Sequence, residues 1–514
     1  MPQHTQPEPR ATRVSRRNLL LGAGALALCG VGGAGAMAVI GPRIDGFVTD
    51  TSVTPQPMDS PLRIPEVVTA GGGVVELTVR AGRTAFVGGR EAATKGVNGS
   101  YLGPTLRVRR GEEVMIDVRN DLDEPTTMHW HGMHVPPEMD GTPHQSIAPG
   151  ATWHARWRCT HESGTLWYHP HPHGRTAQQV WEGIAGMIIV DDPEDLDHRL
   201  PSEYGIDDIP VVIQDRGFDD DGELATSGAG ALGMFGDTIL VNGTPGARFD
   251  VTRERTRLRI LNGSNTRWYH LALSDGRAMQ VVATDGGRLY GGPATVRTLL
   301  VSPGERYEVV VTVRAGEDIT LRSVTSDYPG GKDYGTGEEF DVLRLVAKGS
   351  LSASPPPAFP PASSPPETPG VPVRRIRLDG HSAINGEEMD MSRIDSVHAA
   401  GGVEVWEVSS LGTAAHNFHI HGVSFRVLSV GDGDPDAVDR GPKDTVKVPK
   451  DGSVVRLLVT MPEHASETVP YMAHCHVLQH EDMGMMMQFT VVEPGQEASA
   501  PRTLSMQGAG HAKH

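Results

Sequence analysis

Short runs of alternating apolar and polar residues recur along most of the chain. Two examples are Val114–Val118 and Tyr307–Val313, and glycine, proline or asparagine bounds such runs. Alternation turns one face of an extended chain towards a core and the other towards water. No amphipathic helix of convincing length stands out from the pattern. We therefore predict an all-β protein of antiparallel strands, arranged in sandwiches or small barrels.

One sequence unit recurs three times after the N-terminal segment. The copies contain LGPTLRVRRGEEVMIDVRN, VNGTPGARFDVTRERTRLRILNGSN and INGEEMDMSRIDSVHAAGGVEVWEVSS. An acidic segment follows the first copy, and a proline-rich, stiff segment separates the second copy from the third. A length of 514 residues also favours about three domains. The predicted organisation is a first domain at 43–195, a second at 204–350, a linker at 351–371, a third domain at 372–495 and a flexible tail at 496–514.

The N-terminal segment has the features of an export signal. SRRNLL at 15–20 places two arginines before an apolar run, rich in glycine and alanine, that extends to Ile40. A twin arginine before an apolar core is typical of the Tat pathway, which exports folded proteins. Residues 1–42 are therefore predicted to engage the Tat export machinery. The protein is expected in the periplasm, the cell envelope or the medium, with this segment either cleaved or retained as a weak anchor.

Composition and charge narrow the possible functions. The chain has 62 glycines and 39 prolines but only 5% aromatic residues, a mixture that favours a turn-rich β protein. Its formal net charge of −18 argues against nucleic acid as a partner and against docking on anionic lipid. Three cysteines, Cys29, Cys159 and Cys475, are too few for a disulfide framework. Cys159 is expected to be a small buried apolar residue.

Histidines are arranged in four H-x-H pairs, in MHWHG, WYHPHPHG, HNFHIHG and HCH. Residues two apart on an extended strand point to the same face, so each pair can present two imidazoles to one cavity. Neutral imidazole binds copper, zinc, iron and nickel, and eight ligands exceed the needs of one ion, so the pattern favours a metal cluster. His173 continues one alternation and could replace His169. The pairs are His129/His131, His169/His171, His419/His421 and His474/His476.

A second type of site is predicted in the stretch HCHVLQHEDMGM at 474–485. Cys475 lies between two histidines, so its thiolate points to the opposite face of the same strand. There it could meet His416, His480 and Met485. Two histidines, one thiolate and one weak thioether are the ligands of blue-copper electron-transfer sites. Zinc is the competing metal, but zinc rarely takes methionine. One residue of backbone would then connect a one-electron site with the cluster.

The four motifs HWHG, WYHPH, HNFHIHG and HCHVLQHEDMGM resemble those of three-domain bacterial multicopper oxidases of the laccase and cuprous-oxidase type. The resemblance covers about residues 60–495. It implies three cupredoxin-like Greek-key β-sandwich or barrel domains in series, four copper ions per chain and no ligands in the middle domain. It implies a type 1 copper on His416, Cys475, His480 and Met485, a type 2 copper on His129 and His419, and a type 3 pair on His131, His169, His171, His421, His474 and His476.

The same resemblance implies the reaction. Single electrons would come through Cys475 from a phenol, an aromatic amine, a bilirubin-like compound or a metal ion such as Cu(I), and dioxygen would be reduced to water. Asp140 in PPEMDG and Glu481 in HEDMGM match proton donors. Asn417 stands where the family most often has proline, and its amide could hydrogen-bond near the thiolate. No long methionine-rich insert is present in the third domain, which favours organic substrates over Cu(I).

Two other functions compete with an oxidase of organic donors. One is a periplasmic copper-binding or copper-tolerance protein that oxidises Cu(I). The other is a non-catalytic cupredoxin scaffold of the cell envelope. The scaffold is disfavoured because such proteins lack the copper ligands that this sequence retains.

Overall fold

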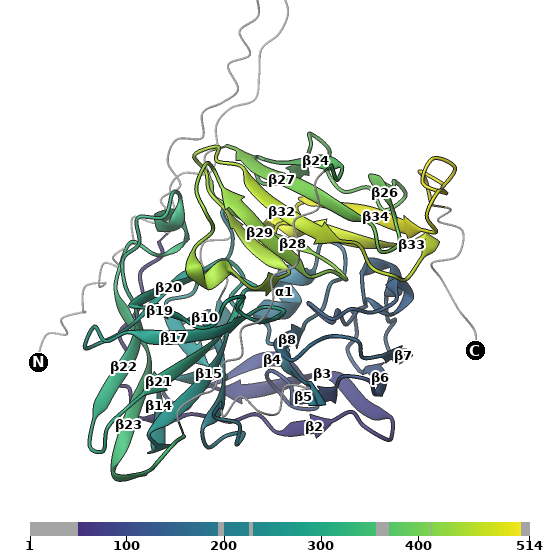
Figure 1. Ribbon diagram of the computed structural model, residues 1–514. Helices are drawn as coiled ribbons and strands as arrows, with labels where there is room; N and C mark the ends of the chain where they lie inside the picture. Colours follow the sequence, from purple (N-terminus) through teal and green to yellow (C-terminus); the bar gives the residue numbers. More distant parts are fainter. Residues whose placement is uncertain (1–49, 194–199, 226–229, 356–369, 413, 505–514) are drawn as a thin grey trace, which may run out of the picture. The chain divides into compact units, whose positions relative to one another are not determined.

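The computed structural model describes residues 50–193, 200–225, 230–355, 370–412 and 414–504. Within these residues the chain forms six β-sheets and only short helices (Figure 1). The prediction of an all-β protein is therefore confirmed. In chain order the sheets group into three pairs, called here the first, middle and third sheet pairs.

The first sheet pair contains the first copy of the repeated sequence unit. Its strands are β2 (Val67–Thr69), β3 (Val75–Ala85), β4 (Glu91–Val97), β5 (Thr105–Arg109), β6 (Glu113–Asn120), β7 (Thr152–Arg158), β8 (Gly164–Tyr168) and β9 (Gly186–Asp191). One sheet has the order β4-β3-β6-β7 and the other β2-β5-β9-β8. Leu77, Val114 and Ile188, from both sheets, share one buried apolar cluster, so alternation along each strand builds a common core.

The middle sheet pair is the largest. Its strands are β1 (Ser60–Pro61), β10 (Asp208–Phe218), β11 (Leu224–Ala225), β12 (Thr238–Val241), β13 (Thr244–Pro245), β14 (Ala247–Arg253), β15 (Arg255–Asn262), β16 (Tyr269–Leu273), β17 (Met279–Thr284), β18 (Gly287–Arg288), β19 (Ala294–Val296), β20 (Thr298–Val301), β21 (Arg306–Thr312), β22 (Asp318–Ser323) and β23 (Phe340–Ser352). One sheet has the order β1-β14-β23-β22-β16-β20. The other has β13-β12-β10-β15-β21-β17-β18, with β11 beside β10 and β19 beside β17.

The third sheet pair carries the C-terminal motifs. Its strands are β24 (Val373–Asp379), β25 (Ala383–Ile384), β26 (Ser396–Ala399), β27 (Val403–Leu411), β28 (His416–Ile420), β29 (Phe425–Val430), β30 (Pro442–Lys443), β31 (Thr445–Val448), β32 (Val455–Thr460), β33 (Ser466–His474) and β34 (Met486–Val492). The sheet orders are β25-β24-β27-β32-β29-β30 and β26-β34-β33-β28-β31. Ile376, Phe418 and Cys475 belong to its shared core.

Several strands pair in parallel, which corrects the prediction of antiparallel pairing. β3 pairs in parallel with β6, β10 with β15, and β24 with β27. Other neighbours, such as β6 with β7 and β33 with β34, are antiparallel. Apolar–polar alternation describes which face a side chain occupies and is the same for both directions of pairing. The pattern therefore predicts the strands but not the direction of their neighbours.

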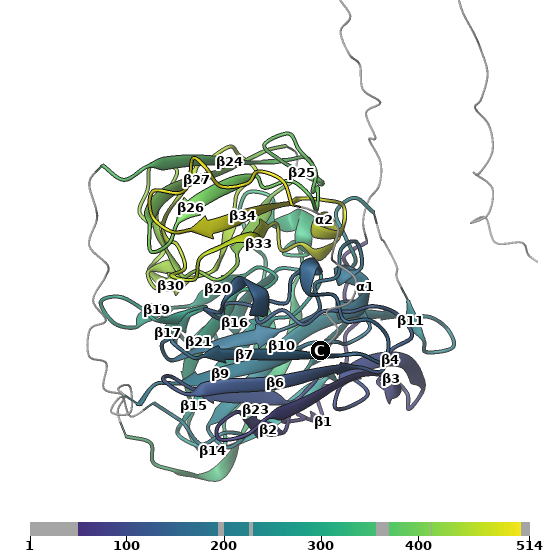
Figure 2. The same cartoon turned by 90° about the vertical axis from the view of Figure 1, so that its right-hand side faces the viewer.

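Two short helices come together beside the histidine motifs. They are α1 (Thr176–Trp181) and α2 (Leu478–Asp482), which are in contact (Figure 2). The Asp482 carboxylate accepts hydrogen bonds from the backbone N–H groups of Thr176 (2.8 Å) and Ala177 (2.9 Å). The first N–H groups of a helix have no partner within it, so this carboxylate ties α1 to the third sheet pair. Single 3₁₀ turns lie at η1 (Pro137–Met139), η2 (Pro143–Gln145), η4 (Gly331–Tyr334) and η5 (Ala437–Asp439).

Some predicted segments lie outside the described residues. These are the Tat segment at 1–42 with Cys29, most of the proline-rich linker, and the end of the tail at 505–514. Within the described part of the chain, we find no helix with the length and apolar character that crossing a membrane requires.

Candidate metal centres

The four H-x-H pairs lie where the first and third sheet pairs meet. His129 and His169 exchange backbone hydrogen bonds of 2.8 and 3.2 Å, which align two pairs from the first sheet pair. His419 on β28 is the cross-strand partner of His474 on β33, which aligns the other two. All eight histidines are fully buried. Only His419 and His474 of the eight lie within strands, so this isolated bridge and this register, and not the predicted alternation along extended strands, bring the eight imidazoles into one site.

Rings from the two sheet pairs stack on one another. The ring centroids of His129 and His421 are 3.8 Å apart, and those of His131 and His419 are 3.7 Å apart. The Nε2 atom of His474 lies 3.2 Å from His171 Nε2 and 3.1 Å from His421 Nε2. Three close groups made of histidines alone result: His129/His131/His169, His129/His419/His421 and His171/His421/His474.

Hydrogen bonds to oxygen atoms orient several of these rings through one ring nitrogen. Other ring nitrogens have no hydrogen-bond partner. The Nδ1 atoms of His129 and His419 bond to the backbone oxygens of Asp140 and Asp444, both at 2.8 Å. The Nδ1 atom of His169 bonds to the backbone oxygen of Pro170 at 2.9 Å. Within the described residues, the atoms left without a hydrogen-bond partner include His129 Nε2, His131 Nδ1, His169 Nε2, His419 Nε2 and both nitrogens of His476. Buried nitrogens without partners are costly, and a metal ion would satisfy them.

Burial also favours the neutral form of six of the cluster imidazoles, the form that binds metal. Burial lowers the pKa of six of these histidines well below the ordinary value, and neighbouring histidines lower it further for most. The six are His131, His169, His171, His421, His474 and His476.

Other histidines considered from the sequence take different positions. His173 is exposed, whereas His169 is buried among the cluster rings. His144 bonds to Gln488 at 2.9 Å and His134 to Ser424 at 3.0 Å. His161 bonds through Nδ1 to the backbone oxygen of Glu162 at 2.8 Å.

Asp140 and Glu481 lie beside the cluster. The Asp140 carboxylate accepts a 2.8 Å hydrogen bond from His421 Nδ1. Glu481 oxygens are 3.4 Å from His171 Nδ1 and 3.3 Å from His474 Nδ1. Burial, together with the neighbouring Asp482, raises the pKa of Glu481 well above its ordinary value. Burial therefore favours the protonated form of this carboxyl more than in a solvated glutamate.

The structure adds Asp444 and Arg306, which the sequence analysis missed. Asp444 Oδ1 accepts a 3.0 Å hydrogen bond from His131 Nε2. Arg306 NH1 and NH2 donate to the two Asp444 oxygens at 2.7 and 2.5 Å, and Arg306 Nε donates to the backbone oxygen of Thr165 at 2.9 Å. Arg306 thus joins all three sheet pairs. Neither residue lies in a histidine motif, and no spacing in the sequence connects them.

Cys475 forms a separate centre in the third sheet pair. Its sulfur lies 3.6 Å from both His416 Nδ1 and His480 Nδ1. Met485 is buried in the same core, and its backbone oxygen accepts a 3.2 Å hydrogen bond from Cys475 N. Burial raises the pKa of the Cys475 thiol to about 12 and lowers that of His416 to about 3. A bound metal ion would remove the thiol proton, and this donor set fits copper.

Asn417 and the backbone of Cys475 connect this centre to its surroundings. Asn417 Oδ1 accepts a 2.9 Å hydrogen bond from His476 N and lies 3.6 Å from Cys475 Sγ. Its Nδ2 donates to the backbone oxygen of Pro303 at 2.6 Å. The backbone oxygen of Cys475 bonds to His474 Nδ1 at 3.1 Å, so one peptide unit links the thiol to a cluster imidazole.

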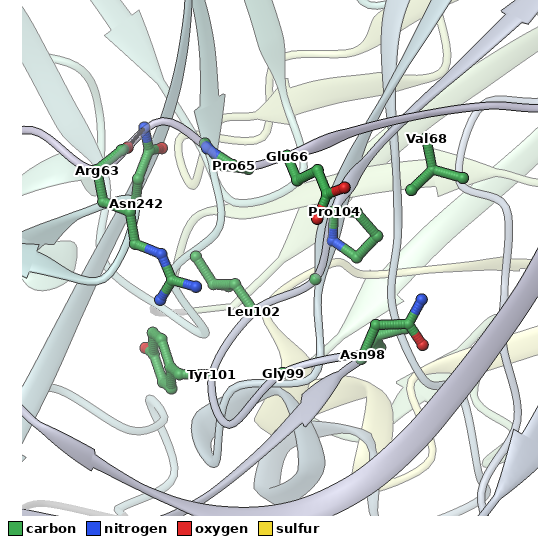
Figure 3. Close-up of a pocket in the computed structure, with 12 residues that line it drawn as sticks. Arg63, Pro65, Glu66, Val68, Asn98, Gly99, Tyr101, Leu102, Pro104 and Asn242 are labelled. Atoms are coloured by element: carbon green, nitrogen blue, oxygen red, sulfur yellow. Dashed lines mark hydrogen bonds between the residues drawn. The ribbon is translucent and has the colours of Figure 1, made fainter.

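A small pocket elsewhere has no comparable chemistry. It has a volume of about 110 Å³ and is lined by residues that include Arg63, Tyr101 and Asn242 (Figure 3). Asn242 Nδ2 donates to the backbone oxygens of Arg63 (2.9 Å) and Pro210 (2.8 Å). Tyr101 donates to Gln214 at 3.0 Å. These bonds give the residues structural roles.

Cys159 lies outside both centres. It is a buried free thiol, as the sequence predicts.

Comparison with known proteins agrees with this architecture. Sequence profiles described as multicopper oxidase match residues 78–195, 218–322 and 363–495. The multicopper oxidase mco of Staphylococcus epidermidis is 35% identical over 424 residues, covering 81% of this chain and 88% of that protein. The cell division protein FtsP of Salmonella typhimurium is 36% identical over 442 residues, covering 84% and 92%.

Solved structures give the same result. The laccase-like multicopper oxidase CueO from Ochrobactrum sp. is 39% identical with a TM-score of 0.78, covering 84% of this chain and all of that one. That enzyme is described as oxidising lignin model compounds and lignosulfonate. Fold and site together define a three-domain, cupredoxin-like copper protein. The chain belongs to the multicopper oxidase family, whose members use copper, dioxygen and a reducing substrate, and it is an oxidase.

Proposed function

We propose that this protein couples one-electron oxidation of phenols, aromatic amines or metal ions such as Cu(I) to four-electron reduction of dioxygen to water. The observation that carries the proposal is the position of Cys475. Its sulfur lies 3.6 Å from nitrogens of His416 and His480, while its sequence neighbours His474 and His476 belong to the eight-histidine cluster. One peptide unit therefore joins a site for accepting single electrons to a site for several metal ions.

The residues present would hold four copper ions per chain. His416, Cys475, His480 and Met485 would hold the type 1 copper, and His129 and His419 the type 2 copper. Bound copper would supply the one-electron exchange with the donor and the reduction of dioxygen. The type 3 pair would take His131, His169, His171, His421, His474 and His476.

The remaining groups act by orientation and by proton supply. Asp140, Asp444 and backbone oxygens would fix which nitrogen of His129, His131 and His421 carries the proton and which is free for metal. Glu481, whose Oε2 lies 3.3 Å from His474 Nδ1, would supply a proton close to where reduced oxygen would need it. Full burial of the site keeps bulk water from partly reduced oxygen.

Replacement of the thiol tests the function directly. We expect Cys475→Ser to lose blue absorption and oxygen consumption with a phenol while its far-UV circular dichroism stays unchanged, because a hydroxyl is a poor copper ligand. Cys159→Ala, which removes a buried thiol away from the site, is the matched control and should keep both. A blue band that persists in Cys475→Ser would refute the type 1 assignment.

Similarity to FtsP makes a non-catalytic envelope protein the second candidate. Retention of all twelve proposed ligands as buried groups favours the oxidase instead. Copper analysis beside oxygen uptake separates the candidates, because an oxidase binds four copper ions and consumes oxygen, whereas a non-catalytic envelope protein consumes no oxygen. We also propose that residues 1–42 direct export of the protein through the Tat pathway.

A further inference from the structure

His480, which belongs to the Cys475 centre, is shielded from solvent. Its side chain is fully buried. Nδ1 faces the Cys475 sulfur at 3.6 Å, so the opposite nitrogen, Nε2, points away from the centre. That nitrogen lies 3.1 Å from His381 Nδ1 and 3.2 Å from the backbone oxygen of Ala231. A reducing substrate that arrives from solvent therefore cannot touch His480 itself.

His381 covers the buried edge of His480. It lies in the connection between β24 and β25 and is partly exposed. Its ring centroid is 4.8 Å from that of His480 and 6.5 Å from that of His416. His381 is thus the imidazole that lies between solvent and the Cys475 centre on this side.

The hydrogen bond between the two histidines determines what His381 presents to solvent. With Nδ1 of His480 on the thiolate side, the proton of that ring is on Nε2 and can be donated to His381 Nδ1. His381 then carries its own proton on Nε2. This leaves an N–H donor and an aromatic ring edge for a bound molecule, and no lone pair for a metal cation.

We propose that His381 is the docking residue for the reducing substrate and that this substrate is an oxygen-bearing aromatic donor of the phenol class. The proposal rests on the proposed oxidase function. The phenol oxygen accepts a hydrogen bond from His381 Nε2. The phenol would lose one electron, which would pass by way of the His381–His480 pair to the copper(II) ion that the Cys475 centre would hold, leaving copper(I). The phenol proton is released to solvent water, and a phenoxyl radical leaves.

Two substitutions of His381 distinguish loss of the hydrogen bond to the phenol from a general disturbance of the Cys475 centre. His381→Phe keeps a flat ring but has no N–H donor, and His381→Gln keeps an N–H donor on a shorter side chain. His270→Phe is the matched control, since His270 is another partly buried histidine that bonds a backbone oxygen, that of Thr325 at 2.7 Å. The copper-loaded proteins are mixed without oxygen with either a methoxyphenol or a water-soluble ferrocene, which gives an electron without a hydrogen bond. The rate of bleaching of the blue band is measured.

We expect His381→Phe to keep the blue band but to be reduced by the phenol about tenfold more slowly, the equivalent of one hydrogen bond. Reduction by the ferrocene should change by less than about twofold, and His381→Gln should recover most of the phenol rate. An unchanged phenol rate in His381→Phe, or an equal loss with both reductants, would overturn the proposal. If the wild-type protein has no blue band, the oxidase function itself fails, which is a separate result.

Discussion

Single side chains at the cluster differ in charge because their surroundings differ. Glu481 is buried without a cationic partner among the described residues, and its pKa is raised well above the ordinary range by burial and by Asp482. Asp482 is only partly buried and accepts two backbone hydrogen bonds from α1, and its pKa rises only to about 6. Backbone N–H groups stabilise the ionised form, so adjacent carboxyls hold their protons differently.

This difference predicts the effect of removing the Glu481 proton. In Glu481→Gln, we expect the reduced protein to be reoxidised by dioxygen about 10²-fold more slowly, since a positioned proton donor contributes on the order of 10²–10⁴-fold. Anaerobic reduction of the blue band should stay at the wild-type rate. Stopped-flow spectroscopy resolves the two half-reactions. The exposed Glu493→Gln serves as control, and wild-type reoxidation in Glu481→Gln would contradict a proton role.

At the scale of elements, the sequence predicted strands well and their connections less well. The run Val114–Val118 falls on β6, and the run Tyr307–Val313 falls on β21 except for Val313, because alternation is a local property. The parallel pairing of β3 with β6 depends on residues far apart in sequence, so no local pattern contains it. The two α-helices are only about one turn and a half long, too short for an amphipathic repeat to appear.

Strands β15 and β21 contain a cross-strand ion pair that sequence reading did not anticipate. Arg259 and Glu308 are register partners, and Arg259 NH1 donates to Glu308 at 2.8 Å. Glu308 also accepts from Thr165 on β8 at 2.7 Å and from Arg257. Burial raises the pKa of Glu308, but Arg257 and Arg259 outweigh that effect and lower it to about 2. The pair thus joins the first and middle sheet pairs.

We expect Glu308→Gln to lower the free energy of unfolding by about 2 kcal/mol at neutral pH, because Arg257 and Arg259 lose one counter-charge while Asp208 still pairs with Arg259. The folded pKa of about 2 lies below the ordinary value of 4.5, so the carboxylate stabilises the protein fully above pH 4.5. That contribution is lost as pH falls towards 2. Between pH 7 and pH 2, the unfolding temperature of the variant should therefore fall less steeply than that of the wild type. Parallel curves for variant and wild type would contradict the assignment.

At the scale of the whole molecule, the sequence predicted the proposed ligands but not the residues that hold them. The ligands occur as H-x-H pairs or within ten residues of such a pair, so their short spacing is visible in the sequence. Asp444, Arg306 and His381 become neighbours of the ligands only after distant segments have folded together. The middle sheet pair, expected to carry no ligands, still contributes Arg306 to the cluster environment.

Arg306 gives a prediction at this scale. We expect Arg306→Met to weaken copper binding at the eight-histidine cluster by about 10–100-fold, the usual cost of losing a group that orients a ligand. The blue band of the Cys475 centre should remain. Arg306→Lys keeps the charge but cannot donate to both Asp444 oxygens in the same geometry. Its copper binding should be intermediate between that of the wild type and that of Arg306→Met. Chelator competition with copper analysis measures this. Wild-type copper retention in Arg306→Met would exclude a positioning role.

The division of the cluster between the first and third sheet pairs also affects the order of assembly. His129 and His131 leave the ribosome long before His474 and Cys475, so a growing chain carries half of the ligands without their partners. Stacked rings, one from each half, form only when both sheet pairs have folded and docked. Metal retention in the full cluster is therefore possible only after synthesis has passed the last motif. The complete centre can therefore form only in a chain that has been translated and folded through its third domain.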